Sequence, residues 1–371
     1  MTLANCATPE GTRRYAERLR AATAPDHFRL QQKLSMSTIG LGTYLGHWDD
    51  RTDQMYQKAI ERAIELGVNV IDSAINYRFQ RSERAIGVTL KRLFNSGRFA
   101  RDEMIIATKG GFFPFDGEPP RDPRRWVMEN IIDRGVASSG DIVGSHCMSP
   151  AYLKDQLERS LVNLGLDVID IYYIHNPETQ LDVIARDEFL RRVRSAFEFL
   201  EEAVSEGKIG LYGTATWNGY RQPPGSRDYM SLAEMVEVAR EVAGESHHFR
   251  VVQLPYNMAM PEALMLENQT VDGDSVSLLV AAKRLGVTIM CSASILQAKL
   301  ARNLPPFVAE ALAGLTTDAQ RAIQFVRSTP GVTTALIGMG QRSHVEENLK
   351  VSRISPAPIE DFLKIFSDDG T

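Results

Sequence analysis

The sequence predicts an α/β fold in which parallel strands and outer helices form a (β/α)8 TIM barrel. Two observations lead to this prediction. Eight short apolar runs alternate with longer segments of helical period along most of the 371 residues. Each run is continuously apolar, as expected of a strand that is buried on both faces of a parallel sheet. The predicted strands are residues 38–44, 68–74, 104–109, 168–175, 209–216, 249–256, 288–292 and 333–339.

Amphipathic segments between these runs predict the outer helices. Several of them end at a glycine just past the last apolar turn, which is a common helix stop, and the next strand follows within a few residues. Such a stop occurs at Gly67, Gly165, Gly207 and Gly286. The regular alternation favours a closed barrel over an open sheet. The predicted helices include residues 52–66, 82–94, 150–164, 188–206 and 231–242.

Two segments fall outside this regular pattern. Residues 1–36 are polar and helix-prone, and we expect them to form an N-terminal extension or barrel plug, which leaves residues 37–371 as a single barrel domain. Residues 110–149 are rich in Pro, Gly, Asp and Arg and form a long loop after the third strand. Active sites of such barrels lie at the carboxyl ends of the strands, so a structureless loop at this place is expected to be functional or mobile.

Composition excludes several classes of protein. The chain is 43% hydrophobic and 24% charged, and its net charge of −5 gives no reason to expect nucleic acid or an anionic membrane as a partner. The three cysteines are far apart and form no CxxC pair, and His247-His248 has no partners at ligand spacing, so we expect neither a disulfide framework nor a metal site. No apolar stretch approaches the roughly 18 residues of a membrane span. The sequence predicts a soluble, cytoplasmic protein.

Three ionisable residues close predicted strands, and a tyrosine follows one of them. Asp72, Lys109 and His175 end the second, third and fourth runs, and Tyr77 lies in the loop after Asp72. A charged side chain at the end of an apolar strand points into the barrel mouth, where it must be paired. Each residue alone has a structural explanation, such as a turn cap, a lysine reaching solvent, a core histidine or loop packing. Their occurrence on consecutive strands favours a shared site.

These four side chains suit carbonyl reduction. The reaction needs a hydride donor and a proton donor to the developing alkoxide. A free tyrosine, with a pKa of about 10, holds its proton firmly, and a neighbouring lysine cation lowers that pKa. We therefore expect Tyr77 to act as general acid in reduction and as base in oxidation, with its pKa tuned by Lys109. Asp72 would orient Lys109, and His175 would position the carbonyl.

The motifs around these residues resemble the aldo-keto reductase family. Residues 67–77, followed by 82–87, are similar to the segment with the family's catalytic aspartate and tyrosine. Residues 105–109 resemble its lysine strand, and 170–177 resemble its histidine strand. The resemblance extends from about Gly40 to Leu349. It implies an NADP(H)-dependent oxidoreductase that moves a hydride between the nicotinamide and a carbonyl or alcohol.

The resemblance also implies where the dinucleotide binds. Gly42, Thr43 and Tyr44 would line the nicotinamide ribose beside Asp72, and Gln253 matches the glutamine that binds the carboxamide. Residues 337–349 resemble the adenosine-phosphate segment, in which glycines let the backbone approach phosphate and a helix start offers N–H groups. The candidate contacts in that segment are Gly338, Gly340, Gln341, Arg342, His344, Glu347 and Asn348.

The chain departs from the family pattern at several cofactor positions. Thr216, after Ala215, stands where the family usually has Ser-Asn, and Ser292 stands where an aromatic residue usually stacks on the nicotinamide. Trp217 or Tyr44 is then the candidate to stack on the face of the nicotinamide. His344 occupies a position often held by arginine. Arg342 is the candidate for the 2′-phosphate, because that group needs a cationic donor. Arg342 favours NADP(H), and NAD(H) stays open.

Two other functions remain as alternatives. Lys109 could form a Schiff base in an aldolase-type barrel, and the altered cofactor positions would suit a protein that binds the dinucleotide to sense redox state. The substrate, the direction of the reaction and the oligomeric state do not follow from the sequence. Arg78 and Arg81 are either contacts for an acidic group or solvent-facing. The residues expected to wall the substrate pocket are Tyr44, Trp48, Phe79, Phe112, Phe113 and Trp217.

Overall fold

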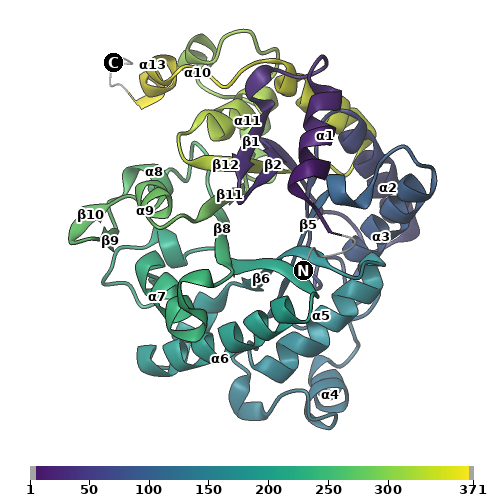
Figure 1. The fold of residues 1–371 in the computed structure, drawn as a ribbon, viewed down its shortest axis with the longest axis vertical. Helices are drawn as coiled ribbons and strands as arrows, with labels where there is room; N and C mark the ends of the chain where they lie inside the picture. Colours follow the sequence, from purple (N-terminus) through teal and green to yellow (C-terminus); the bar gives the residue numbers. More distant parts are fainter. Residues whose placement is uncertain (1–5, 367–371) are drawn as a thin grey trace.

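The computed structural model describes residues 6–366 and confirms the predicted barrel. Eight parallel strands close in the order β11-β12-β3-β4-β5-β6-β7-β8 (Figure 1). Every strand lies within two residues of its predicted bounds, because a continuously apolar run has no favourable place except between the barrel interior and the helices. The strands are β3 (Ile39–Gly42), β4 (Val70–Asp72), β5 (Ile105–Gly110), β6 (Ile169–His175), β7 (Ile209–Ala215), β8 (Phe249–Pro255), β11 (Thr288–Ser292) and β12 (Val332–Gly338).

The outer helices follow the strands in the expected alternation. Side-chain caps define several starts: Asp49 accepts from the amide of Thr52, and Ser231 accepts from that of Glu234. Gly165 ends its helix in the left-handed conformation, with φ 62°. The helices are α2 (Asp50–Glu65), α3 (Arg81–Asn95), α5 (Pro150–Leu164), α6 (Arg186–Ser205), α7 (Leu232–Ala243), α9 (Leu278–Arg284), α11 (Asp318–Ser328) and α12 (Arg342–Asn348). Smaller elements decorate the loops: α8 (Glu262–Met265), the hairpin β9 (Gln269–Val271) and β10 (Asp274–Val276), α10 (Pro306–Ala311) and α13 (Ile359–Leu363).

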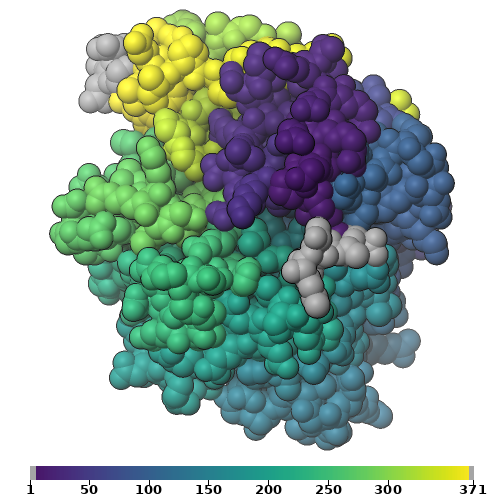
Figure 2. All heavy atoms as spheres, viewed as in Figure 1, coloured from purple at the N-terminus to yellow at the C-terminus, as the bar shows by residue number. Residues whose placement is uncertain are grey.

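The N-terminal extension closes the end of the barrel at which the strands begin. It consists of α1 (Pro9–Leu19) and an antiparallel hairpin of β1 (Phe28–Gln31) and β2 (Leu34–Ser37). Leu34 and Met36 pack into the same apolar cluster as the barrel interior, so the hairpin acts as a plug. Figure 2 shows the extension, in purple, spread over this face of the molecule. β2 ends at Ser37, one residue beyond the expected end of the N-terminal extension at residue 36.

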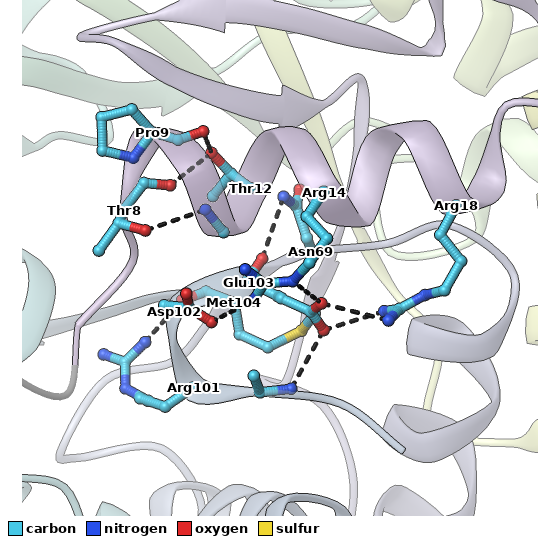
Figure 3. A network of polar contacts seen from close by, with 12 residues as sticks. Thr8, Pro9, Thr12, Arg14, Arg18, Asn69, Arg101, Asp102, Glu103 and Met104 are labelled. Atoms are coloured by element: carbon cyan, nitrogen blue, oxygen red, sulfur yellow. Dashed lines mark hydrogen bonds and ion pairs between the residues drawn. The ribbon is translucent and has the colours of Figure 1, made fainter. Parts of the chain in front are cut away.

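A buried carboxylate fastens the extension to the barrel. Glu103, just before β5, is 1% exposed and accepts hydrogen bonds from Arg14 Nε at 3.0 Å and from Arg18 Nη2 at 2.9 Å (Figure 3). The amide of Ala100 donates to the same carboxylate at 3.1 Å. A buried charge is tolerated when it is paired and its oxygens accept hydrogen bonds. This network orients α1 across the start of β5.

The segment of residues 110–149 is structured. The predicted long loop after the third strand is present, but it is not structureless: it contains α4 (Pro123–Val127), which continues into a π-helical turn (Met128–Ile132). Its apolar residues form a small core of their own against Tyr152 of α5. The burial of these apolar side chains therefore stabilises one conformation of the segment. The buried members of this core are Ile131, Val136, Ala137, Cys147 and Tyr152, with Phe113, Trp126, Val127, Ile132 and Ile142 packed around them.

The substitution Gly11→Ala should destabilise the protein, because α1 approaches the barrel closely at this glycine. A Cβ at residue 11 would lie 2.2 Å from the carbonyl oxygen of Asp102, so the helix must move. We expect a loss of about 1–3 kcal/mol in the free energy of unfolding, which exceeds the gain in helix propensity. Urea unfolding measures it. Gly225→Ala is the control, since its Cβ would meet nothing within 4 Å. Equal stabilities of the two variants would contradict the close approach.

Candidate active site

A cavity of about 1070 Å³ opens at the carboxyl ends of the barrel strands. Its walls come from the loops that follow seven of the strands around the barrel and from α2 and α12, and β8 contributes Gln253 from within the strand. Asp72, Tyr77 and His175 lie on these walls. Lys109 stands behind them and is 1% exposed. The structure therefore brings the four predicted catalytic residues together at the end of the barrel where the chemistry of this fold is found.

Lys109 and Asp72 form a buried ion pair. Asp72 lies opposite Ala107 in the β4–β5 register, and Lys109, two residues further on, points to the same side of the sheet. The Nζ atom donates to Asp72 Oδ2 at 2.6 Å and to the carbonyl oxygen of Ser73 at 2.7 Å. The other carboxylate oxygen, Oδ1, accepts from Gln253 Nε2 at 2.7 Å. The carboxylate is thus held from two strands, β5 and β8.

The ring of Tyr77 is packed among aromatic and cationic neighbours. Its centroid lies 4.9 Å from that of Tyr44, 5.8 Å from that of His175 and 5.1 Å from Lys109 Nζ. Burial raises the pKa of Tyr77 well above 10, and the negative charge of Asp72 acts in the same direction. This direction is opposite to the one expected from a lysine cation. The physical reason is that Asp72 neutralises the ammonium while the site is enclosed.

His175 ends β6 as a neutral imidazole. Burial lowers its pKa well below 6.5, and the charge of Lys109 lowers it further. Its Nδ1 atom is buried and has no hydrogen-bond partner among residues 6–366. A neutral imidazole at the cavity wall can exchange a hydrogen bond with a ligand oxygen without adding a charge to the site.

The comparisons with known proteins agree with this geometry. The sequence profile of the aldo/keto reductase family matches residues 38–303, which include all four of these side chains. The chain belongs to the aldo/keto reductase family. Its crystal-structure relatives include an aldo/keto reductase from Klebsiella pneumoniae in complex with NADP and acetate, with a TM-score of 0.62 and 18% identity. That match covers 94% of this chain and 98% of the other. At 18% identity it shows that the two proteins share a fold.

Two sequence relatives show how broad the family is. NADH-specific methylglyoxal reductase of Escherichia coli (strain K12) is 29% identical over 207 residues, which are 54% of this chain and 54% of that protein. The chain thus spans about half the length of this relative. A putative voltage-gated potassium channel subunit beta of Schizosaccharomyces pombe is 23% identical over 340 residues, 88% of this chain and 87% of that protein.

The cavity of this aldo/keto reductase also collects the predicted cofactor residues, with one exception. Arg342, the first residue of α12, is not on its walls; its Nε donates to Glu346 Oε1 at 3.0 Å, and its side chain is 61% exposed. The Oγ1 atom of Thr216 is buried without a hydrogen-bond partner in the described chain. The predicted residues that line the cavity are Gly42, Thr43, Tyr44, Asp72, Thr216, Gln253, Ser292, Gly338, Gly340, Gln341, His344, Glu347 and Asn348.

The two glycines of the adenosine-phosphate segment serve different purposes. A Cβ at Gly338 would meet only Leu45, at 3.9 Å, so this backbone is open to a ligand as expected. A Cβ at Gly340 would lie 3.1 Å from the ring of Tyr56 on α2. Gly340 therefore also allows the β12–α12 turn to pack closely against α2.

Sequence reasoning missed some residues of the cavity wall. Asn76 and Asn176 line it and stand next to Tyr77 and His175 in the chain, which is the signal that could have found them. Arg51 lines it as well, and it is the only arginine or lysine among the described residues that do so. No motif marks Arg51, because its place depends on α2 packing beside α12.

The predicted substrate wall is partly correct in position. Tyr44, Phe112 and Trp217 line the cavity. Trp48 and Phe79 instead contact each other edge to face, with ring centroids 5.3 Å apart, and Phe113 packs in the core of the 110–149 segment. Both candidate arginines form ion pairs: Arg78 pairs with Asp53, and Arg81 pairs with Asp50 and Asp53.

The described residues hold no group of three or more His, Cys, Asp or Glu side chains that could bind a metal ion. None of the helices within residues 6–366 is both long and apolar enough to cross a bilayer.

Proposed function

We propose that this aldo/keto reductase transfers a hydride between NADP(H) and the carbonyl or alcohol group of a small molecule. One observation carries the proposal. Tyr77, His175 and Asp72 line the same cavity as the cofactor-type residues at the ends of β3, β8, β11 and β12, and Lys109 lies directly behind them. The NADP-bound relative from Klebsiella pneumoniae supports this cofactor. The relative from Escherichia coli is NADH-specific, so binding of NAD(H) must be measured as well.

The residues present fit a dinucleotide. Thr216 Oγ1 and His175 Nδ1 are buried polar atoms that lack partners among the described residues, and the open backbone at Gly338 lets a phosphate approach. Thr216 and Gln253 would hold the carboxamide, and the turn before α12 would hold the phosphates. The bound nicotinamide supplies or accepts the hydride.

The chain's own residues handle the proton. Tyr77, whose pKa is raised by burial, holds its proton firmly and can donate it to the developing alkoxide during reduction. The neutral His175 orients the carbonyl oxygen toward that hydroxyl. Lys109 places a cation 5.1 Å from the phenol ring, and Asp72 fixes that cation and offsets its charge. The alkoxide thus forms beside a preorganised donor.

The aldolase alternative loses support from the position of Lys109. Its Nζ is occupied by Asp72 and Ser73, and the side chain is buried behind the cavity wall. A Schiff-base lysine must reach the substrate carbonyl. The redox-sensing alternative is favoured by one observation, the long match to a putative potassium channel subunit. Sustained turnover of NADPH with aldehydes, ketoses, aldoses or quinones, followed at the nicotinamide absorbance, separates an enzyme from a sensor, which would oxidise its bound cofactor once.

The substitution Tyr77→Phe should remove the proton donor and leave the cavity shape intact. We expect kcat for carbonyl reduction to fall by about 10²–10⁴-fold, with the Kd of NADPH within about twofold of the original value. Steady-state kinetics and fluorescence titration measure the two quantities. Tyr152→Phe is the matched control, because the hydroxyl of Tyr152 has no partner in the described chain and lies away from the cavity. Unchanged turnover in Tyr77→Phe would remove this residue from the mechanism.

Reduction and oxidation should depend on pH in opposite ways. A raised pKa keeps Tyr77 protonated from neutral to alkaline pH, and a lowered pKa keeps His175 neutral at acidic pH. We therefore expect kcat for reduction to stay level through neutrality and to fall only at alkaline pH, where the phenol ionises. Oxidation needs the phenolate, so its kcat should rise with pH. A reduction rate that already falls at about pH 7 would show that Lys109 lowers the pKa of Tyr77 in the working complex.

Arg51→Ala should weaken NADPH binding more than NADH binding. The 2′-phosphate needs a cation, and Arg51 is on the cavity wall, whereas Arg342 points to Glu346. Because hydrogen bonds to charged groups contribute about 1.5–3 kcal/mol, we expect at least a tenfold rise in the Kd of NADPH and little change for NADH. Isothermal titration with both dinucleotides checks this. If Arg342→Ala produces the selective loss instead, the earlier assignment of the 2′-phosphate to Arg342 is correct.

A further inference from the structure

We propose that His146 is a positioning residue of this enzyme, which fixes the main chain of His175 and the ring of Phe112 so that the 110–149 segment becomes a wall of the carbonyl site. This inference rests on the proposed function. It starts from a feature of the backbone: the ladder between β5 and β6 ends at Gly110 and Ile174, one residue before His175. At His175, the hydrogen bond to the main chain comes from His146 and not from β5.

The two ends of the segment meet just after β5. The amide of Cys147 donates to the carbonyl oxygen of Gly111 at 2.9 Å, and the amide of Phe113 donates to that of Ser145 at 3.1 Å. His146 is 1% exposed, and its Nε2 lies 2.8 Å from the carbonyl oxygen of His175. The segment is thereby closed onto the end of β6.

The hydrogen bonds around His146 determine its tautomer. Arg192 can only donate, and its Nη1 lies 2.7 Å from Gln180 Oε1, which fixes the orientation of that amide. Gln180 Nε2 therefore faces His146 Nδ1, at 3.0 Å, and donates to it. Burial lowers the pKa of His146 to about 4, so the ring is neutral. Its single proton must be on Nε2, from which it is donated to the carbonyl of His175.

The ring of Phe112 is enclosed by the two histidines. It meets His146 at 5.2 Å and His175 at 5.0 Å between ring centroids, both edge to face, and it also lines the cavity. Gly111 makes this approach possible. A Cβ there would lie 2.8 Å from His146 Nε2 and 3.0 Å from the carbonyl oxygen of His175, and its φ of +143° is unfavourable for other residues.

Arg192 extends the connection to an outer helix. From α6 it donates to the carbonyl oxygens of Gly140, at 2.8 Å, and Asp141, at 3.1 Å, in addition to Gln180. A continuous set of hydrogen bonds thus joins α6, the 110–149 segment and the end of β6. Small displacements of a catalytic group reduce rate strongly, because the reacting atoms must be aligned. These hydrogen bonds therefore hold His175 in a fixed position for catalysis.

The test compares His146→Leu, which removes both hydrogen bonds at similar volume, with His146→Gln, whose side-chain amide can still donate near the position of Nε2. We expect kcat for carbonyl reduction to fall at least tenfold in His146→Leu and to recover most of this loss in His146→Gln, with the Kd of NADPH within twofold in both. Ile132→Ala is the control, because it disturbs the core of the segment away from His175. It should lower the Tm and leave kcat near the original value.

Three outcomes would overturn the inference: kcat of His146→Leu within twofold of the original, an equal fall in Ile132→Ala, or no recovery in His146→Gln. A second measurement does not depend on activity or on the stability of a variant. Nitrogen-15 spectra of the unaltered protein at neutral pH should show His146 protonated on Nε2 alone; a proton on Nδ1 would also overturn it. If the unaltered protein reduces no carbonyl while His146 shows the Nε2 proton, the proposed function fails and the geometry stands.

Discussion

The buried ion pair of Lys109 and Asp72 is the interaction on which the rest of the site depends. Moving either charge into the barrel alone costs several kcal/mol, so each requires the other. The register of β4 and β5 places them on the same side of the sheet, and Gln253 from β8 binds the second carboxylate oxygen. Three strands are tied together beneath the cavity. Burial raises the pKa of Tyr77, and the charge of Asp72 acts in the same direction while it balances the cation of Lys109.

The two ends of the barrel are closed by different means. At the start of the strands, Leu34 and Met36 fill the interior, and the ion pairs of Glu103 hold α1 in place. The hairpin and the barrel interior share one apolar cluster at this end. At the other end the strands stop at Asp72, His175, Gln253 and their neighbours, and the loops leave a cavity open. The two ends thus differ in kind: apolar packing and ion pairs close one, and polar side chains line the cavity at the other.

The segment of residues 110–149 changes how the mouth of this barrel is built. It has its own apolar core, and the burial of these side chains holds it in one shape. Its two ends meet beside β5, and His146 joins them to the main chain of His175. The aromatic surface that faces the proposed carbonyl site is therefore made in part by residues that are remote from the barrel strands in sequence. A substrate would meet a preformed wall at Phe112, and Trp217 lines the same cavity.

The sequence by itself determined the strand and helix order and the four residues at the ends of β4, β5 and β6, because buried parallel strands need continuous apolar runs and charges at their ends must face one another. It also identified cofactor-type residues near the carboxyl ends of strands, such as Gln253 and Gly338. Only the tertiary structure decided where long side chains point. Arg342 turns to Glu346 and Arg51 reaches the cavity, while His146 contacts His175 across 29 positions of the chain. These choices depend on which helices and loops pack together, and no local period in the sequence records such packing.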